Sequence, residues 1–180
     1  MKWNESRKAF KEAKDWIIYN QKDDGRITWD EKGKCDPWDH CECLIALALF
    51  EEWDPFIKGV DWFFNTLSKD GLIYPEFQNN KITHNHFESH HAPYIILPLM
   101  QAVLMGRGDL ITSDIKSKIK IIFDQLDRFR DTDGYYNWAR DKNGLCDNSL
   151  ITASMSIFLS LKALNNSSKI KFDQKLWSSK

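Results

Sequence analysis

The sequence predicts an all-α protein built from helical hairpins in two layers. Helices with one apolar face alternate with helices that are apolar on nearly all sides, which is typical of outer helices packed around buried inner ones. Three loops carry an Asp-Gly pair with aromatic residues after it, at Gly25, Gly71 and Gly134. Polar residues lead into each apolar helix. A unit that recurs in this way predicts a repeat architecture.

The first hairpin is predicted to pair an amphipathic helix over residues 4–20 with an inner helix near residues 37–53. Asp36 is suited to cap the inner helix, and Pro37 suits its first position because proline lacks the N–H that would have no partner there. The unbroken apolar run over residues 44–50 predicts that this helix is buried.

Two more hairpins follow the same plan. The second starts at Asp54–Pro55 and continues, after an Asp-Gly loop, into an inner helix near residues 88–105. The third ends in an inner helix near residues 149–164. Residues 165–180 are predicted to be a polar tail or part of one more helix. We expect residues 1–180 to form a single domain.

All three inner helices should begin at the same end of the molecule, because each is reached through the same kind of loop. Their polar lead-in residues would then converge on one rim. The first carboxylates of the three lead-ins are Asp39, Glu88 and Asp147. The sequence therefore predicts a polar site above an apolar floor.

Composition excludes several classes of function. The chain has 25 basic and 26 acidic residues, a net charge of -1, and its Lys and Arg are scattered, so nucleic acid is not an expected partner. The longest apolar run, residues 94–103, is too short to span a bilayer. The start of the chain has no secretory h-region, and the four cysteines have neither zinc-finger nor disulfide spacing. We expect a reduced, cytoplasmic protein.

Asp39, His40 and Glu42 form the first candidate catalytic group. Carboxylates and an imidazole beside an apolar cavity can have shifted pKa values and perform general acid–base chemistry. Helix capping alone would explain Asp39, because an acid in the first turn favours the helix dipole. Capping does not account for His40 and Glu42 beside it.

A run of histidines supplies the second group. His84, His86, His90 and His91 lie within eight residues, with Glu88 among them. Glu88 is a candidate acid or base and His91 its partner. A metal site would need His86 and His90 on one helical face with Glu88 adding an oxygen. The alternative, a polar loop with solvated histidines, is preferred for His84 and His86.

Aromatic and polar residues near the loops are candidates for substrate binding. The aromatic rings could stack on a substrate, or fill the gaps between neighbouring hairpins, which repeat architecture by itself requires. Arg140 could bind an anionic group or pair with Asp141. The predicted set is Trp29, Trp38, Tyr74, Tyr94, Trp138, Arg140 and Asp147.

Several of these motifs resemble a known family. They are Gln21-x-x-Asp-Gly25-x-Ile-x-Trp29, then Asp36-Pro37-Trp38-Asp39-His40-x-Glu42, and Asp133-Gly134-x-x-x-Trp138-Ala-Arg140-Asp141. In this order they resemble the bacterial prenyltransferase-like proteins of the α/α-toroid superfamily, which also holds terpene cyclases and six-hairpin glycosidases. The resemblance spans about residues 10–164. It departs from the family in lacking Asp-x-Asp-Asp and Asp-Asp-x-x-Asp.

The resemblance implies an incomplete toroid, half of a ring, which a second copy or another chain would complete. It implies an enzyme that acts on a small-molecule substrate, either an isoprenoid or a carbohydrate. The apolar inner helices favour the isoprenoid, and carboxylates without a diphosphate motif favour the carbohydrate. The alternative is a non-catalytic binding or scaffold module.

No cofactor is expected. The resemblance to prenyltransferase β-subunits implies one weaker alternative, a zinc site formed by Asp39, Cys41 and His91.

Overall fold

The computed structural model describes residues 10–146 and 148–167. Within these residues six α-helices carry the fold: α2 (Lys11–Asn20), α3 (Pro37–Leu49), α4 (Trp53–Thr66), α5 (Ile96–Leu104), α6 (Ser113–Asp124) and α7 (Ile151–Ser167). Three short 3-10 helices flank them: η1 (Pro93–Ile95), η2 (Gly108–Leu110) and η3 (Leu126–Phe129). No helix in this part of the chain is both long enough and apolar enough to cross a membrane.

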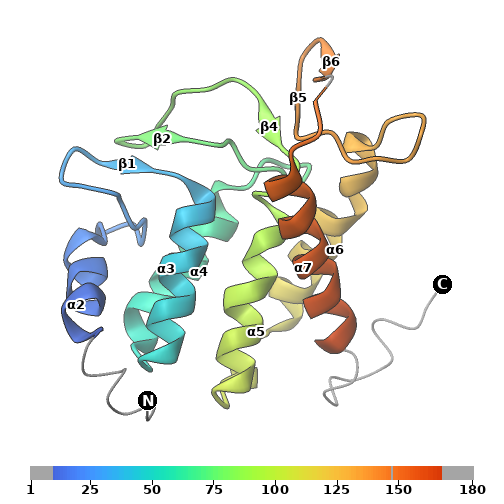
Figure 1. Ribbon diagram of the computed structural model, residues 1–180. Helices are drawn as coiled ribbons and strands as arrows, with labels where there is room; N and C mark the ends of the chain where they lie inside the picture. The colour runs from blue at the N-terminus through green and yellow to red at the C-terminus, as the bar shows by residue number, and fades with distance from the viewer. Residues whose placement is uncertain (1–9, 147, 168–180) are drawn as a thin grey trace.

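The helices form the two layers that the sequence predicts. The inner helices α3, α5 and α7 lie side by side, with α5 packed against both of the others, and α4 packs behind α3 (Figure 1). Helices α2, α4 and α6 alternate with them along the chain. The inner helices all begin at the end that carries the long loops (Figure 1). The predicted rim is therefore present.

The prediction of an all-α protein is incomplete, because the loops at the rim pair into two small antiparallel sheets. One contains β1 (Lys34–Cys35), β2 (Phe77–Gln78) and β3 (Lys81–Ile82), and the other contains β4 (Phe87–Glu88), β5 (Ala139–Asp141) and β6 (Gly144–Leu145). Asn79 and Asn80 have positive φ values of 48° and 66°, which permit the tight turn between β2 and β3.

The sheets correct the predicted start of the second inner helix. Glu88 lies in β4, paired with Ala139, and not in a helix. The helical segment begins with η1 at Pro93 and continues into α5. The first and third inner helices lie close to their predicted ranges. Residues 4–9 of the first predicted helix and residues 168–180 of the predicted tail lie outside the residues that the structure describes.

The start of α3 follows the sequence prediction. The Asp36 carboxylate accepts hydrogen bonds from the backbone N–H groups of Trp38, at 2.6 Å, and Asp39, at 3.4 Å, and Pro37 occupies the first turn. Below this cap, Leu44 and Leu47 are completely buried. The cap thus holds a polar helix end directly above the apolar core.

Two of the Asp-Gly loops pack against the next outer helix. Gly25 has φ +96°, and a Cβ there would lie 2.0 Å from the backbone oxygen of Lys58 in α4. Gly71 has φ +72°, and its Cβ would meet the Ile121 side chain of α6 at 2.8 Å. Only glycine fits such an approach at positive φ. These contacts set the spacing between successive hairpins.

We expect Gly25→Ala to lower the free energy of unfolding by roughly 3 kcal/mol, because the methyl group adds a backbone clash to the strain of positive φ. Gly106 is the matched control, since it has φ +86° with nothing within 4 Å of an added Cβ. Gly106→Ala should cost only about 1 kcal/mol. Urea unfolding of both variants measures the difference, and equal losses would show that the Lys58 contact is unimportant.

Candidate active site at the rim

Glu88 lies at the centre of a cluster of ionisable groups at the rim. Its Oε1 lies 3.2 Å from His86 Nε2, within hydrogen-bonding distance. Its Oε2 lies 3.5 Å from His91 Nε2 and 3.7 Å from His90 Nε2. The side chain is 16% exposed. Burial raises the pKa of Glu88, although the hydrogen bond with His86 opposes the rise.

Asp36 is the second carboxylate of this cluster. Its Oδ1 lies 3.8 Å from His91 Nε2, so the imidazole of His91 lies between Asp36 and Glu88. Burial raises the pKa of Asp36 to about 6, and the backbone N–H of Trp38 acts in the opposite direction. Burial also lowers the pKa of His91 well below its ordinary value, so this ring is neutral. Two carboxylates that favour protonation therefore flank one neutral imidazole.

Aromatic rings line the approach to this cluster. Trp38 packs edge-to-face against His90, with centroids 4.9 Å apart, and against Tyr94 at 5.5 Å. The Tyr94 hydroxyl donates a 2.5 Å hydrogen bond to Glu42 Oε1, which also accepts one from Trp38 Nε1 at 3.3 Å. Five predicted residues thus come together: Trp38, Glu42, Glu88, His91 and Tyr94.

The third loop reaches the same cluster through the second sheet. Trp138 lies edge-to-face with His86, with centroids 5.6 Å apart, and its carbonyl accepts a hydrogen bond from the backbone N–H of Ser89. The pairing of β4 with β5 fixes this arrangement. Aromatic residues from two different parts of the chain, Trp38 and Trp138, therefore lie beside the Glu88 cluster.

Glu88, His90 and His91 could hold a metal ion, since one potential ligand atom from each lies within 4.8 Å of the others. Both histidines are buried and the pKa of His90 is lowered to about 4 by burial, so both rings are in the neutral form that metals bind. The weaker zinc alternative of Asp39, Cys41 and His91 is not assembled. Cys41 is completely buried and Asp39 is exposed, as expected for residues two apart on a helix.

His40 lies in the core and not at the rim. Its Nδ1 accepts a hydrogen bond from the backbone N–H of Ile27 at 3.2 Å, and its Nε2 lies 3.0 Å from the carbonyl of Gly59. The donor is therefore Nε2–H. Both nitrogens are engaged with backbone, so His40 joins α3, α4 and the first loop, and we leave it out of the proposed catalytic set.

The remaining predicted residues lie around the cluster. Asp39 and Trp29 line a groove of about 430 Å³ beside α2, where burial raises the pKa of Asp39 and a hydrogen bond with Trp29 opposes this. Tyr74 packs against Phe87 of β4, with the two rings tilted and their centroids 4.5 Å apart. Asp147 lies outside the described residues.

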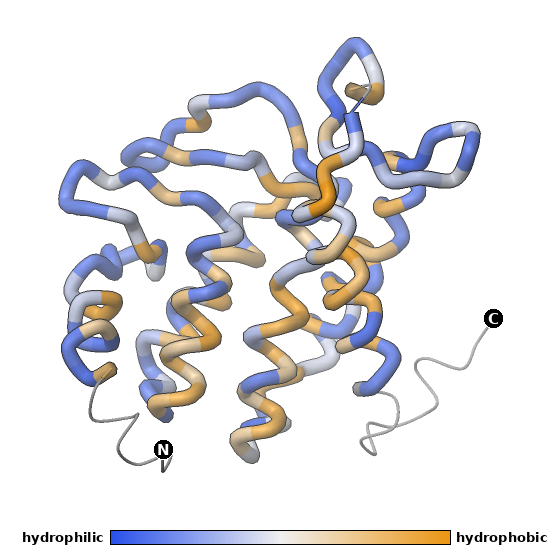
Figure 2. Tube along the Cα trace, viewed as in Figure 1, coloured by the Kyte–Doolittle hydropathy of each residue, from blue (hydrophilic) through white to orange (hydrophobic). Residues whose placement is uncertain are grey.

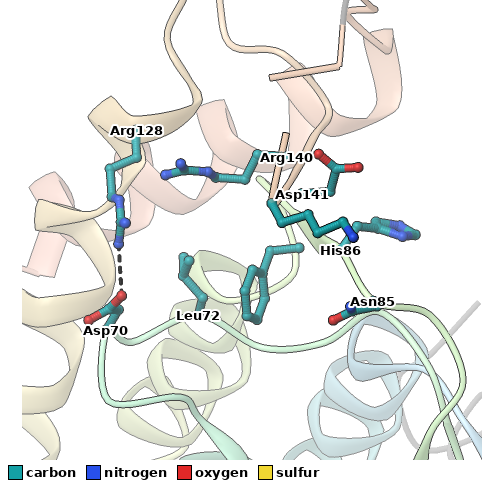
Figure 3. Close-up of a pocket in the computed structure, with 9 residues that line it drawn as sticks. Asp70, Leu72, Asn85, His86, Arg128, Arg140 and Asp141 are labelled. Atoms are coloured by element: carbon teal, nitrogen blue, oxygen red, sulfur yellow. Dashed lines mark hydrogen bonds and ion pairs between the residues drawn. The ribbon is translucent and has the colours of Figure 1, made fainter. Parts of the chain in front are cut away.

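Arg140 lines a separate pocket of about 240 Å³ formed by residues of β4 and β5 and by the second loop (Figure 3). It extends from β5 toward the side where Arg128 donates a 3.0 Å hydrogen bond to Asp70. His86 lines this pocket and also bonds Glu88, so the pocket adjoins the carboxylate cluster. Asn85 and Asp141 add further polar groups.

Sequence reasoning missed the roles of Asp36 and His90. Asp36 was assigned only to capping, and its place beside His91 depends on contacts between distant parts of the chain. His90 was placed in a metal-binding helical pair with His86, but these residues lie in a strand-and-turn segment. The concentration of histidines around Glu88 is a signal that could have located His90, whereas no local signal marks Asp36 as a neighbour of His91.

No protein-family model matches the chain. A curated relative, the MMP endo-(1,4)-3-O-methyl-alpha-D-mannosidase of Mycolicibacterium hassiacum, is 25% identical over 142 residues, which make up 79% of this chain and 40% of the relative.

Two solved structures share the fold. A novel alpha-amylase from Clostridium perfringens matches 90% of this chain and 48% of its own, with a TM-score of 0.61 and 14% identity. Endoglucanase Cel10, a family 8 glycosyl hydrolase from Klebsiella pneumoniae, matches 64% of this chain and 38% of its own, with a TM-score of 0.51 and 16% identity.

These likenesses support a helical, toroid-like fold and correct one part of the sequence interpretation. The proteins found are glycoside hydrolases by name, so the resemblance to prenyltransferase-like proteins is not supported beyond the fold. The chain spans less than half the length of each.

The core position of His40 predicts how stability depends on pH. Burial lowers the pKa of His40 from 6.5 to about 4. Between these values the unfolded chain binds the proton and the folded chain does not, so this residue makes stability fall as the pH drops from 6.5 toward 4, by at most about 1.4 kcal/mol per pH unit.

We expect His40→Gln to be less stable than the wild type at pH 7.5 but to show a shallower fall in unfolding free energy between pH 6.5 and 4. Leu47→Ala is the control, because it should lose stability by a similar amount at every pH. Urea unfolding across this range provides the measurement. Parallel pH profiles for wild type and His40→Gln would contradict the core assignment.

Proposed function

We propose that this chain carries the acid–base site of a carbohydrate-hydrolysing enzyme. The observation that carries the proposal is the position of Glu88, which is largely buried, has a raised pKa and lies beside a second carboxylate on an aromatic-lined rim. The names of the relatives support the carbohydrate over the isoprenoid.

Glu88 is suited to be the general acid. A glycosidase acid must hold a proton at working pH and deliver it to the oxygen of the leaving sugar. Burial raises the pKa of Glu88 and so favours its protonated form, while the hydrogen bond with His86 and the charges of His86 and His84 act in the opposite direction. The rings of His90 and His91 are neutral. His86 orients the carboxyl group through Oε1.

Asp36 is the proposed second carboxylate. It faces the same nitrogen of His91 as Glu88 does, so the two groups lie within the upper limit of about 9.5 Å that glycosidase carboxylate pairs use. In that role Asp36 would accept a proton from water or stabilise positive charge on the sugar. It can do either only when ionised, above its raised pKa.

The surrounding groups fit a sugar chain. Trp38 and Trp138 offer ring faces and edges on the two sides of Glu88, against which sugar C–H groups can pack. Arg140, Asn85 and Asp141 offer donors and acceptors for hydroxyl groups in the adjoining pocket (Figure 3). Two of the three relatives are named for α-linked sugars, so we propose an α-linked oligosaccharide as substrate.

Glu88→Gln tests the acid role, because the amide keeps the shape of the side chain but cannot donate an acidic proton. We expect the hydrolysis rate of α-linked manno- and gluco-oligosaccharides, measured by release of reducing ends, to fall about 10³-fold. Asp61→Asn, which changes an exposed carboxylate on the outer helix α4, should keep the wild-type rate. Full activity in Glu88→Gln would rule out the proposed acid, and oligosaccharide binding by a wild type that releases no sugar would favour a non-catalytic binding module.

Removal of metal ions distinguishes a role of Glu88 as proton donor from a role as metal ligand. As a proton donor, Glu88 needs no metal, so dialysis against EDTA should leave the hydrolysis rate unchanged. As a metal ligand with His90 and His91, it would lose its function with the ion. A loss of activity that added Zn²⁺ restores would therefore replace the acid role of Glu88 with a metal-dependent one.

A further inference from the structure

The third Asp-Gly loop lacks the neighbour that the first two possess. An added Cβ at Gly25 or Gly71 would strike the next outer helix, whereas one at Gly134 would meet nothing within 4 Å. The residue after each glycine shows the same contrast. Arg26 and Leu72 are each 5% exposed, but Tyr135 is 68% exposed. Among the described residues, none fills the position that an outer helix would occupy beside the third loop.

Helix α7 is uncovered on the same edge of the molecule. Its Ala153, Ile157 and Ser160 are buried against the rest of the fold, but five of its other apolar residues are exposed. Figure 2 shows hydrophobic stretches along this helix. The exposed side chains are Ile151, 80%, Met155, 53%, Phe158, 55%, Leu159, 41%, and Leu161, 40%. Such a face is typical of an interface.

The opposite edge, formed by α2, is also uncovered. Trp16 is 54% exposed and Tyr19 is 64% exposed, although α2 packs against α3 through its other side. Trp16 and Ile17 line the 430 Å³ groove with Trp29. Figure 1 places α2 at one end of the arc of helices and α6 and α7 at the other. The two uncovered surfaces are therefore the two ends of one arc.

We propose that a second copy of this chain covers both edges, with α2 of each copy packed beside α7 and Gly134 of the other. The two edges are complementary, since no described outer helix packs beside the third loop and α2 is an outer helix with exposed aromatic side chains. A two-fold axis makes both contacts at once and leaves no apolar edge open. Two copies also supply about the length of the solved alpha-amylase, of which one copy covers 48%.

The pairing would turn an open arc into a closed ring. The carboxylate cluster of each copy would then face the cluster of the other across a shared opening, because all inner helices begin at the same end. The inference rests on the fold and the exposed edges, and it stands or falls separately from the proposed hydrolase activity.

Light scattering during size-exclusion chromatography tests the pairing. We expect a mass of twice the chain mass of 21.2 kDa at micromolar concentration. Phe158→Glu on α7 and Trp16→Glu on α2 should each weaken the dimer roughly 30-fold or more, since each buries a charge in an apolar contact. Ile82→Glu is the control, because Ile82 is an exposed apolar residue on β3 and belongs to neither α2, α7 nor the third loop.

A monomeric wild type up to 100 µM would overturn the proposal, as would dimers that survive both edge variants. A shortened chain that ends at residue 167 tests whether residues 168–180 cover the exposed edge in place of a second copy. If that shortened chain dimerises while the full chain stays monomeric, residues 168–180 cover the edge in place of a second copy. Sugar release is measured on the same samples, so a dimer without activity contradicts only the hydrolase, and an active monomer contradicts only the pairing.

Discussion

The packing of the first two Asp-Gly loops against the outer helices that follow them governs the arrangement of this fold. The backbone at Gly25 approaches the carbonyl of Lys58 so closely that no side chain fits between them. That contact fixes where α4 lies relative to the first loop, and the equivalent contact of Gly71 fixes α6. Because each loop leads into an inner helix, the same contacts decide where the inner helices begin. The positions of Asp36 and Glu88 at the rim follow from this spacing.

The rim combines two features that seldom occur together at a protein surface. It carries carboxylates and imidazoles, but these groups are desolvated enough for burial to dominate their pKa values. The reason is that aromatic rings cover the sides of the cluster. Trp38 shields His90, and Tyr94 closes the space above Glu42. Burial therefore shifts the carboxyl groups toward their protonated forms at a site that lies on the rim.

Local signals in the sequence predicted the helices well, but they did not predict the pairings between residues that lie far apart in the chain. Asp36 and Pro37 mark the start of α3 because capping depends only on neighbouring residues. Each strand has only two or three residues, which is too short for a periodic pattern to predict it. The paired residues can also lie far apart in the chain, as Glu88 and Ala139 do. His40 was assigned to the site because Asp39 is its neighbour. Its spacing to Leu44 and Leu47 places it instead on the buried stripe of α3.

The four cysteines of the chain are free thiols, and Cys35 and Cys41 are completely buried below the rim. Burial raises the pKa of both thiols well above the ordinary value, so neither forms the thiolate that alkylating reagents attack. Cys35 lies in β1 and Cys41 in the first turns of α3. The rate at which Cys35 and Cys41 are alkylated would therefore measure how often the structure beneath the carboxylates unfolds locally and exposes these thiols.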